Sequence, residues 1–165
     1  MGELFSRTPY AFDGYWNEPD KTKEAFRGGW CSVGDLARPD QDGYYHLVDR
    51  KNNMIISGGE NVYPSEVENM LGSHPAVKDV AVAGLPDDKW GERVHTVAVL
   101  QPDSGVHEHE MLDWCKKRIA GYKRSRSISF IPEADMPRTE TGKILHRVLR
   151  ERLRVANSKT SAEAD

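Results

Sequence analysis

The sequence predicts an α+β protein, with a small β-rich segment followed by a two-layer domain in which about three helices pack on a small sheet. Two observations lead to this prediction. Residues 1–50 are rich in Gly, Pro and aromatic side chains and hold short candidate strands. After residue 53, apolar runs alternate with amphipathic helical patterns, as in a sheet covered by helices. The 165 residues, 38% of them hydrophobic, have room for about one domain of ordinary size, or one and part of another.

The β-rich segment contains three candidate strands, at Glu3–Arg7, Trp30–Val33 and Tyr44–Val48. The turn sequence "PDQDG" separates the last two, so we expect them to form a hairpin with a longer loop. Between the first two strands, the pattern of Pro19–Ala25 predicts a polar helix with proline at or near its first position.

The second segment begins with the predicted strand "MIIS", which ends at Gly58-Gly59. The stretch "YPSEVENMLGSH" predicts a helix, because Pro64 suits the first helical position and Gly72 can end it. Two predicted strands follow, "VKDVAVAGL" and "RVHTVAVLQ", on either side of the turn "PDDKWGE".

The last part of the chain predicts a helix in "HEHEMLDWCKKRIAGY", a short strand in "SISFI" and a final helix over residues 144–153. Residues 154–165 are small and polar, and we expect them to be disordered. Four parts result: a β-rich piece (1–50), a connection (51–53), an α+β domain (54–153) and a tail (154–165). Strand-like sequence starts directly at "MGEL", which is more typical of an excised piece than of a natural N-terminus.

Composition and charge argue against several classes of protein. The formal net charge of −3 disfavours a generic nucleic-acid binder, although "KKRIAGYKRSR" is a basic run without an acidic residue. No apolar run approaches the ~20 residues that a membrane span requires. Cys31 and Cys115 lack the CxxC spacing, which favours a reduced, cytoplasmic protein. The six histidines show no ligand spacing, so we expect no protein-held metal.

A Gly-Lys pair near the C-terminus, in "MPRTETGKILHRVLRERL", suggests a phosphate-binding P-loop at first sight. That motif requires a second glycine at the position of Pro137, and Ser or Thr at the position of Ile144. Neither requirement is met, so Lys143 needs a different explanation.

Four segments provide this explanation through their order along the chain: "GWCSVGDL", "VDRKNNMIISGGENVYPSEVE", "LPDDKWGE" and "PRTETGK". Together they resemble the C-terminal third of the adenylate-forming enzymes, which include acyl-CoA synthetases, peptide-synthetase adenylation domains and luciferase-type ligases. The resemblance covers roughly residues 2–153, and "SGGENVYPSEVE" is most similar to acyl-CoA and aryl-CoA ligases.

The resemblance implies that Asp35 accepts hydrogen bonds from the ribose hydroxyls of ATP, a role suited to an ionised carboxylate. Arg50 is then a second nucleotide contact. From the residues alone, a turn aspartate is the favoured reading of Asp35, and Arg50 is a candidate surface partner of Asp49. Asn52 stands where the family has its interdomain hinge, usually Asp or Lys, and asparagine tolerates the unusual backbone angles of a hinge.

The resemblance makes Lys143 the catalytic lysine of the adenylation step. There it bridges the substrate carboxylate and the α-phosphate, a preorganised charge that is typically worth ~10²–10³ in rate. A mobile Thr/Gly loop suits a group that enters for one step and leaves for the next. A lysine that merely begins a helix is disfavoured by the macrodipole.

Six residues are implied in CoA binding: Gly58, Gly59, Trp90, Tyr122, Arg124 and Arg126. The glycines line the tunnel for the pantetheine arm, because a missing Cβ lets a thin chain pass close to the backbone. Trp90 and Tyr122 offer flat faces to the CoA nucleotide, and the two arginines contact its phosphates. Without a role in CoA binding, Trp90 would be a buried anchor of its turn, and the basic segment around Arg124 and Arg126 would be a solvated surface.

The implied reaction has two steps. A carboxylic acid, fatty or aryl, reacts with ATP to give acyl-AMP and pyrophosphate, and the CoA thiol then displaces AMP. Mg²⁺ accompanies ATP and is not bound by residues of this chain. The family's core domain, with its phosphate loop and acyl pocket, is outside this sequence, so we expect the piece alone to be inactive.

Two rival functions stay open at this point. A carrier-protein-loading adenylation domain shares the first step, but the basic CoA-like segment argues against it. A non-enzymatic polyanion-binding module would use "KKRIAGYKRSR" and the basic last helix, with steeply salt-dependent binding. The net negative charge argues against that second reading.

Overall fold

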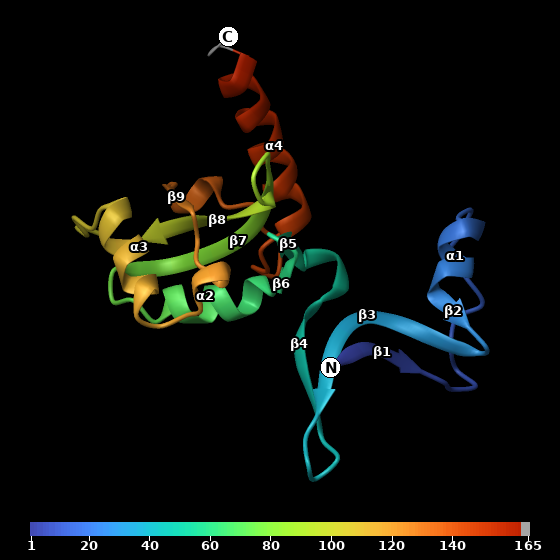
Figure 1. The fold of residues 1–165 in the computed structure, drawn as a ribbon. Helices are drawn as coiled ribbons and strands as arrows, with labels where there is room; N and C mark the ends of the chain where they lie inside the picture. Colours follow the sequence, from blue (N-terminus) through green and yellow to red (C-terminus); the bar gives the residue numbers. More distant parts are fainter. Residues whose placement is uncertain (163–165) are drawn as a thin grey trace. The chain divides into compact units, whose positions relative to one another are not determined.

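The structure is a computed structural model that describes residues 1–162 (Figure 1). The chain forms two compact units, the first over Met1–Asn52 and the second from Asn53 onward. Each unit has its own sheet, and the two are described separately.

The first unit is a four-stranded antiparallel sheet with one short helix. Its elements are β1 (Gly2–Ser6), α1 (Pro19–Ala25), β2 (Phe26–Arg27), β3 (Trp30–Pro39) and β4 (Tyr45–Arg50). The long strand β3 pairs with all three others, and it extends further than the sequence predicted. The predicted hairpin is present between β3 and β4. An Asx turn closes it, because Asp40 Oδ1 accepts hydrogen bonds from the N–H groups of Asp42 and Tyr44.

The second unit holds a five-stranded sheet in the order β6-β5-β8-β7, with β9 paired to β8. Its strands are β5 (Ile55–Ser57), β6 (Glu60–Val62), β7 (Val77–Asp87), β8 (Gly91–Leu100) and β9 (Ser127–Phe130). Its α-helices are α2 (Pro64–Gly72), α3 (Glu108–Lys116) and α4 (His146–Ala162). Three short 3₁₀ turns are η1 (Lys51–Asn53), η2 (Gly121–Lys123) and η3 (Glu133–Asp135). Only β9 runs parallel to its partner; the other pairings are antiparallel.

Both faces of the β7–β8 hairpin are buried, which explains the nearly continuous apolar sequence of these strands. One face packs with α2 and α3, and the other packs with α4 (Figure 1). Thus Val80 and Val82 join the first core, whereas Ala81 between them joins the second. The predicted α+β class is confirmed, and the structure adds that helices cover both faces of the sheet.

The last helix differs from its prediction at both ends. It begins at His146, because Ile144 and Leu145 are used in a β-type pairing with Arg138 and Pro137. It continues to Ala162, so residues 154–162 are helical where we expected disorder. No Gly or Pro follows Gly142, so no strong stop signal interrupts the helix. The end of the predicted tail, residues 163–165, lies outside the described residues.

The helix α3 is also shorter than predicted, since it ends at Lys116. Arg124 contributes to this end: its Nη2 donates to the Lys116 carbonyl (2.8 Å) and its Nε to the Ile119 carbonyl (3.3 Å). The side chain thereby satisfies carbonyl groups that a helix end leaves without a partner.

Candidate functional site

Lys143 lies on a tight hairpin that precedes α4. Leu145 N–H donates to the Pro137 carbonyl (2.8 Å), and Thr139 N–H donates to the Lys143 carbonyl (2.9 Å). Gly142 closes the turn with its N–H on the Thr139 carbonyl (2.9 Å) and a φ of 84°, which favours glycine. The side chain of Lys143 is exposed. The segment is a hairpin bonded within itself, and Lys143 lies three residues before the first residue of α4, so it does not begin the helix. Movement of this loop between the two steps stays a prediction.

The two glycines at the β5–β6 turn lie against Trp90. Gly58 and Gly59 have φ angles of 61° and 83°. Gly58 N–H donates to the Trp90 carbonyl (2.8 Å), and a Cβ built on Gly58 would lie 2.8 Å from Trp90 Cε3. The Arg126 guanidinium lies 4.3 Å from the Trp90 ring centroid, within cation–π distance. Four of the six residues predicted to bind CoA are thus one cluster, the Gly58–Trp90 cluster.

The other two predicted CoA residues are placed differently. Arg124 donates to the carbonyl of Lys116 at the end of α3 and to that of Ile119 in the following loop, so part of its hydrogen-bonding capacity is structural. Tyr122 lies in η2 and is 40% exposed. The neighbouring Lys123 pairs with Glu66 on α2 (2.7 Å), and this hydrogen bond raises the pKa of the Lys123 ammonium above its ordinary value.

The two predicted nucleotide contacts are neighbours across the first unit's sheet. Asp35 on β3 and Arg50 on β4 are register partners, and Arg50 Nε lies 2.9 Å from Asp35 Oδ1. The arginine side chain is 67% exposed and the aspartate 22%, so the guanidinium faces solvent beside a more shielded carboxylate. Asp49, considered as the partner of Arg50 from the sequence, instead accepts the backbone N–H of Arg50 (2.6 Å).

Asn52 is the last residue of the first unit and lies in the 3₁₀ turn η1. The connection between the two sheets is therefore short. A hinge at this residue stays a prediction.

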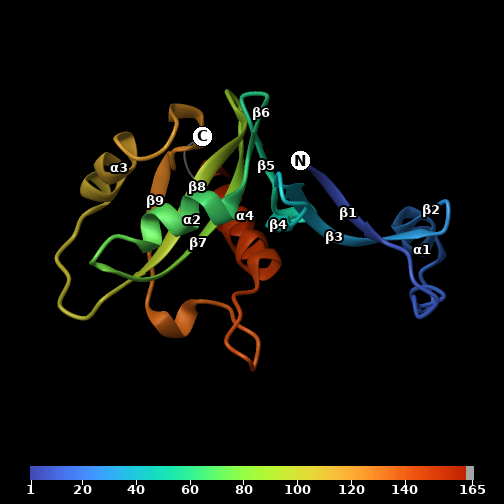
Figure 2. The same ribbon diagram turned by 90° about the horizontal axis from the view of Figure 1, so that it is seen from below.

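The hairpin before α4 and the β5–β6 turn lie at opposite ends of the second unit's sheet (Figure 2). Arg138 of the hairpin pairs with Asp79, near the start of β7, whereas Trp90 follows Asp87 at the end of that strand. Between these two aspartates the strand covers about 25 Å, at about 3.3 Å per residue.

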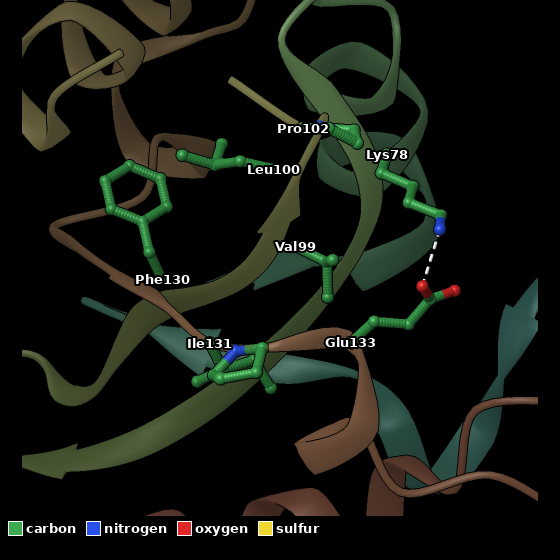
Figure 3. Close-up of a pocket in the computed structure, with 8 residues that line it drawn as sticks. Lys78, Val99, Leu100, Pro102, Phe130, Ile131 and Glu133 are labelled. Carbon is green, nitrogen blue, oxygen red and sulfur yellow. Dashed lines mark hydrogen bonds and ion pairs between the residues drawn. The ribbon is translucent and has the colours of Figure 1, made fainter. Parts of the chain in front are cut away.

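A pocket of about 370 Å³ lies near the start of β7 and the end of β8 (Figure 3). Its walls are mainly apolar, with Val99, Leu100 and Phe130 among them, and the ion pair between Lys78 and Glu133 (2.5 Å) lies beside them. None of the predicted site residues lines this pocket.

His95 is a buried polar residue to which the sequence gave no role. Its Nδ1 lies 2.7 Å from Ser127 Oγ on the neighbouring strand β9. Burial, and then the charge of Arg93, lowers the pKa of His95 to about 4, so the ring is neutral at pH 7. Among residues 1–162, no group of three His, Cys, Asp or Glu side chains is arranged to hold a metal ion.

Arg138 belongs to the motif "PRTETGK", and the sequence assigned no function to it. Its Nη1 donates to the Gly142 carbonyl (2.9 Å), and its Nη2 donates to Asp79 Oδ2. Asp79 is 59 residues away in sequence, so no local pattern could have indicated the pair.

Comparison with known proteins agrees with this geometry. Residues 66–143 match the AMP-binding enzyme C-terminal domain. A feruloyl-CoA synthase from an Amycolatopsis species is 46% identical over 151 residues, which are 92% of this chain and 30% of that protein. A long-chain-fatty-acid–CoA ligase of Mycobacterium tuberculosis is 44% identical over 150 residues, 91% of this chain and 29% of that one. The ATP-bound MatB of Rhodopseudomonas palustris superposes with a TM-score of 0.85 at 35% identity, over 93% of this chain and 30% of that one.

The second unit therefore contains an AMP-binding enzyme C-terminal domain, and the chain corresponds to the C-terminal portion of the acyl-CoA ligases that it matches. It spans about 30% of the length of the curated relatives that it matches. The matched range of the C-terminal domain extends from Glu66 on α2 to Lys143 on the hairpin. No helix in residues 1–162 has the length and apolar character needed to cross a membrane.

Proposed function

We propose that this chain is the C-terminal part of an ATP-dependent, AMP-forming acid–CoA ligase, and that it acts with an adenylating core domain of the same polypeptide. The observation that carries the proposal is the position of the Lys143 hairpin and the Gly58–Trp90 cluster at opposite ends of one sheet. Between the two ends, from Asp79 to Asp87, β7 covers about 25 Å, so groups at the two ends cannot serve one reacting centre at the same time. We therefore propose that the second unit turns about Asn52 and brings the Lys143 hairpin to the active site for one half-reaction and the Gly58–Trp90 cluster for the other.

In the first half-reaction, the carboxylate oxygen of the substrate attacks the α-phosphorus of ATP, and pyrophosphate leaves. Negative charge develops on the α-phosphoryl oxygens, and the ammonium of Lys143 stabilises it. The exposed side chain suits this role, because it is free to enter a second domain's active site. Mg²⁺ is proposed to come with ATP and to neutralise its phosphates.

Asp35 and Arg50 are proposed to hold the nucleotide in this step. The ion pair with Arg50 orients the carboxylate of Asp35, so it can accept hydrogen bonds from two ribose hydroxyls. The more exposed Arg50 guanidinium supplies the donors for the phosphate side of the nucleotide.

In the second half-reaction, the CoA thiol attacks the acyl-AMP carbonyl, and AMP leaves. The positive-φ turn at Gly58 and Gly59 has no Cβ atoms, and open space lies beside Gly59, so the pantetheine arm can pass close to the backbone. Trp90 packs against the turn and accepts the Gly58 N–H at its carbonyl. Arg126, which lies over the Trp90 ring, supplies a cation for a CoA phosphate.

The substrate is proposed to be a fatty or aryl carboxylic acid. The relatives above are named for feruloyl-CoA synthesis and for long-chain fatty acids, and the residues that separate these two classes are outside this chain. Because ATP and CoA are the co-substrates and both cysteines are free and buried, we propose a cytoplasmic enzyme.

The decisive experiment is on the full-length parent. Pyrophosphate release is measured with ATP, Mg²⁺, CoA and a panel that contains ferulic acid and fatty acids of several lengths, for the parent and for Lys143→Ala. We expect acid-dependent release, reduced by at least about 100-fold in Lys143→Ala. Thioester formation from supplied acyl-AMP should continue in that variant. Equal loss of both half-reactions would refute the assignment of Lys143 to adenylation.

The glycine turn has a complementary test. Gly59→Leu should block thioester formation from acyl-AMP while pyrophosphate release continues, because its side chain occupies the pantetheine path. Gly43→Leu is the matched control, since Gly43 has nearly the same φ (86° against 83°) in the exposed β3–β4 turn. Normal thiolation in Gly59→Leu would show that no substrate passes there. The same assay with a carrier protein in place of CoA identifies the thiol acceptor.

A further inference from the structure

We propose that Arg138 is a positioning residue for Lys143, and that Asp79 is the fixed point to which it holds the hairpin. The inference rests on the proposed function of Lys143 in adenylation. The contacts that support it are on the sheet and in the hairpin, and they are independent of any ligand.

Arg138 joins the two halves of the hairpin. It is the pairing partner of Ile144 on the returning strand, and its Nη1 donates to the Gly142 carbonyl (2.9 Å), directly before Lys143. The Gly142 N–H donates within the turn, to the Thr139 carbonyl, whereas the Gly142 carbonyl accepts from Arg138. Arg138 thus holds one side of the peptide plane between Gly142 and Lys143, and Thr139 Oγ1 holds the other by accepting the Lys143 N–H (3.1 Å). Together they orient the backbone from which the lysine side chain departs.

The same guanidinium attaches the hairpin to the sheet. Its Nη2 donates to Asp79 Oδ2, and the other oxygen of this carboxylate, Oδ1, accepts the backbone N–H of Val80 (2.8 Å). Asp79 is thus held by its own strand, whose neighbour Val80 is in the core. Both charged side chains are only 29% exposed, so water screens the pair less than it screens a surface ion pair.

The chemical consequence is positional accuracy. The Lys143 ammonium must reach the substrate carboxylate and the α-phosphate together, and a misplacement of about 1 Å can cost about 100-fold in rate. A hairpin closed only by its own hydrogen bonds could still tilt on the sheet. The bridge from Asp79 through Arg138 to the Gly142 carbonyl removes that freedom. Arginine suits the bridge because its planar fork binds two acceptors at once.

The test uses the full-length enzyme and measures kcat and KM of pyrophosphate release, thioester formation from supplied acyl-AMP, and thermal stability. For Arg138→Ala and Asp79→Asn we expect a fall of about 10- to 100-fold in the kcat of adenylation, with KM for the acid changed less than about 3-fold. Thioester formation should stay within about 2-fold of the parent. Arg138→Lys, which keeps the charge but not the fork, should recover part of the loss.

Lys78→Ala is the matched control, because it breaks a different ion pair, that of the adjacent β7 residue with Glu133 in η3, and leaves the pair of Arg138 with Asp79 in place. It should leave both half-reactions at the parent's rates. A double variant of Arg138→Ala with Asp79→Asn should be no slower than the worse single variant, because both remove one bridge.

The outcomes separate this inference from the proposed function. If Lys143→Ala loses adenylation and the Arg138 and Asp79 variants do not, the bridge has no positioning role, and the function of Lys143 stands. If the Arg138 and Asp79 variants lose both half-reactions equally, or fall in proportion to lost thermal stability, Arg138 is only structural and the inference is wrong. If Lys143→Ala itself retains adenylation, the proposed function fails and this inference fails with it.

Discussion

The two units of this chain differ in how they bury their apolar side chains. The second unit has two cores, and Val62, Val67 and Leu71 in one of them are fully shielded. In the first unit only Cys31 and Ala37 are buried apolar residues, and Tyr10 and Trp16 are 92% and 96% exposed. A sheet with so little core cannot offset the entropy of ordering its chain.

This difference indicates separate folding requirements. The second unit has what an independent domain needs, a sheet covered on both faces by its own helices. Several aromatic side chains of the first unit are exposed instead, which is typical of a surface that another part of a protein covers. That fits the proposal that the first unit completes an adenylating core domain, while the second is a separately folded, movable domain.

The largest expected effect is on folding of the separated units. A fragment of residues 53–165 should unfold cooperatively on heating, and a fragment of residues 1–52 should show no cooperative transition, because it lacks a core. Circular dichroism during a thermal scan distinguishes the two. A sharp transition in the 1–52 fragment would show that the first unit also folds independently, and the difference proposed between the units would be wrong.

One Leu→Ala substitution in each unit should show the same difference in burial, as a difference in the free energy of unfolding. Leu71→Ala removes a fully buried side chain of α2 and should lower the free energy of unfolding of the second unit by about 2–5 kcal/mol. Leu47→Ala in β4, where the side chain is 65% exposed, should change stability by less than about 0.5 kcal/mol. Urea denaturation of the whole chain measures both. Similar effects at the two positions would mean that Leu47 is covered.

Acid should weaken the second unit before the first. Because burial lowers the pKa of His95 from 6.5 to about 4, the unfolded state binds a proton between these values that the folded state does not. The contribution of His95 to stability is complete above pH 6.5 and decreases as the pH falls toward 4, by a total of about 3 kcal/mol. In the first unit, hydrogen bonds lower the pKa of Glu3 and Asp40, so their contributions are present above the ordinary carboxyl pKa and decrease only in stronger acid.

The variant His95→Gln removes the titrating group, and its unfolding free energy should depend less on pH between 4 and 6.5 than that of the parent. Urea midpoints at half-unit pH intervals give the slope. An unchanged slope would show that His95 is not the group responsible.

The smallest effect is expected at the surface. Lys78→Ala breaks an ion pair whose side chains are 41% and 55% exposed, and it should cost less than about 1 kcal/mol. A larger loss in a thermal or urea scan would place this pair, beside the pocket of Figure 3, among the structural contacts of the second unit.

The sequence predicted those helices and turns that a few adjacent residues specify. Proline at the first helical position and the turn "PDQDG" indicated α1, α2 and the β3–β4 hairpin. The short strands β2 and β6 were missed, because two or three residues carry no periodic pattern. The start of α4 was misplaced, since Ile144 fits both an amphipathic helix and the β-type pairing that it makes with Arg138.

By itself the sequence determined the α+β class and the ordered motifs that match the C-terminal portion of acyl-CoA ligases. These are properties of residues that are adjacent in sequence, so they can be recognised without a structure. Only the tertiary structure decided which distant residues meet: Trp90 against Gly58, Arg50 beside Asp35, and Arg138 between Asp79 and Gly142. Such pairs depend on strand register and on packing across a sheet, and both are set by long-range burial rather than by local pattern.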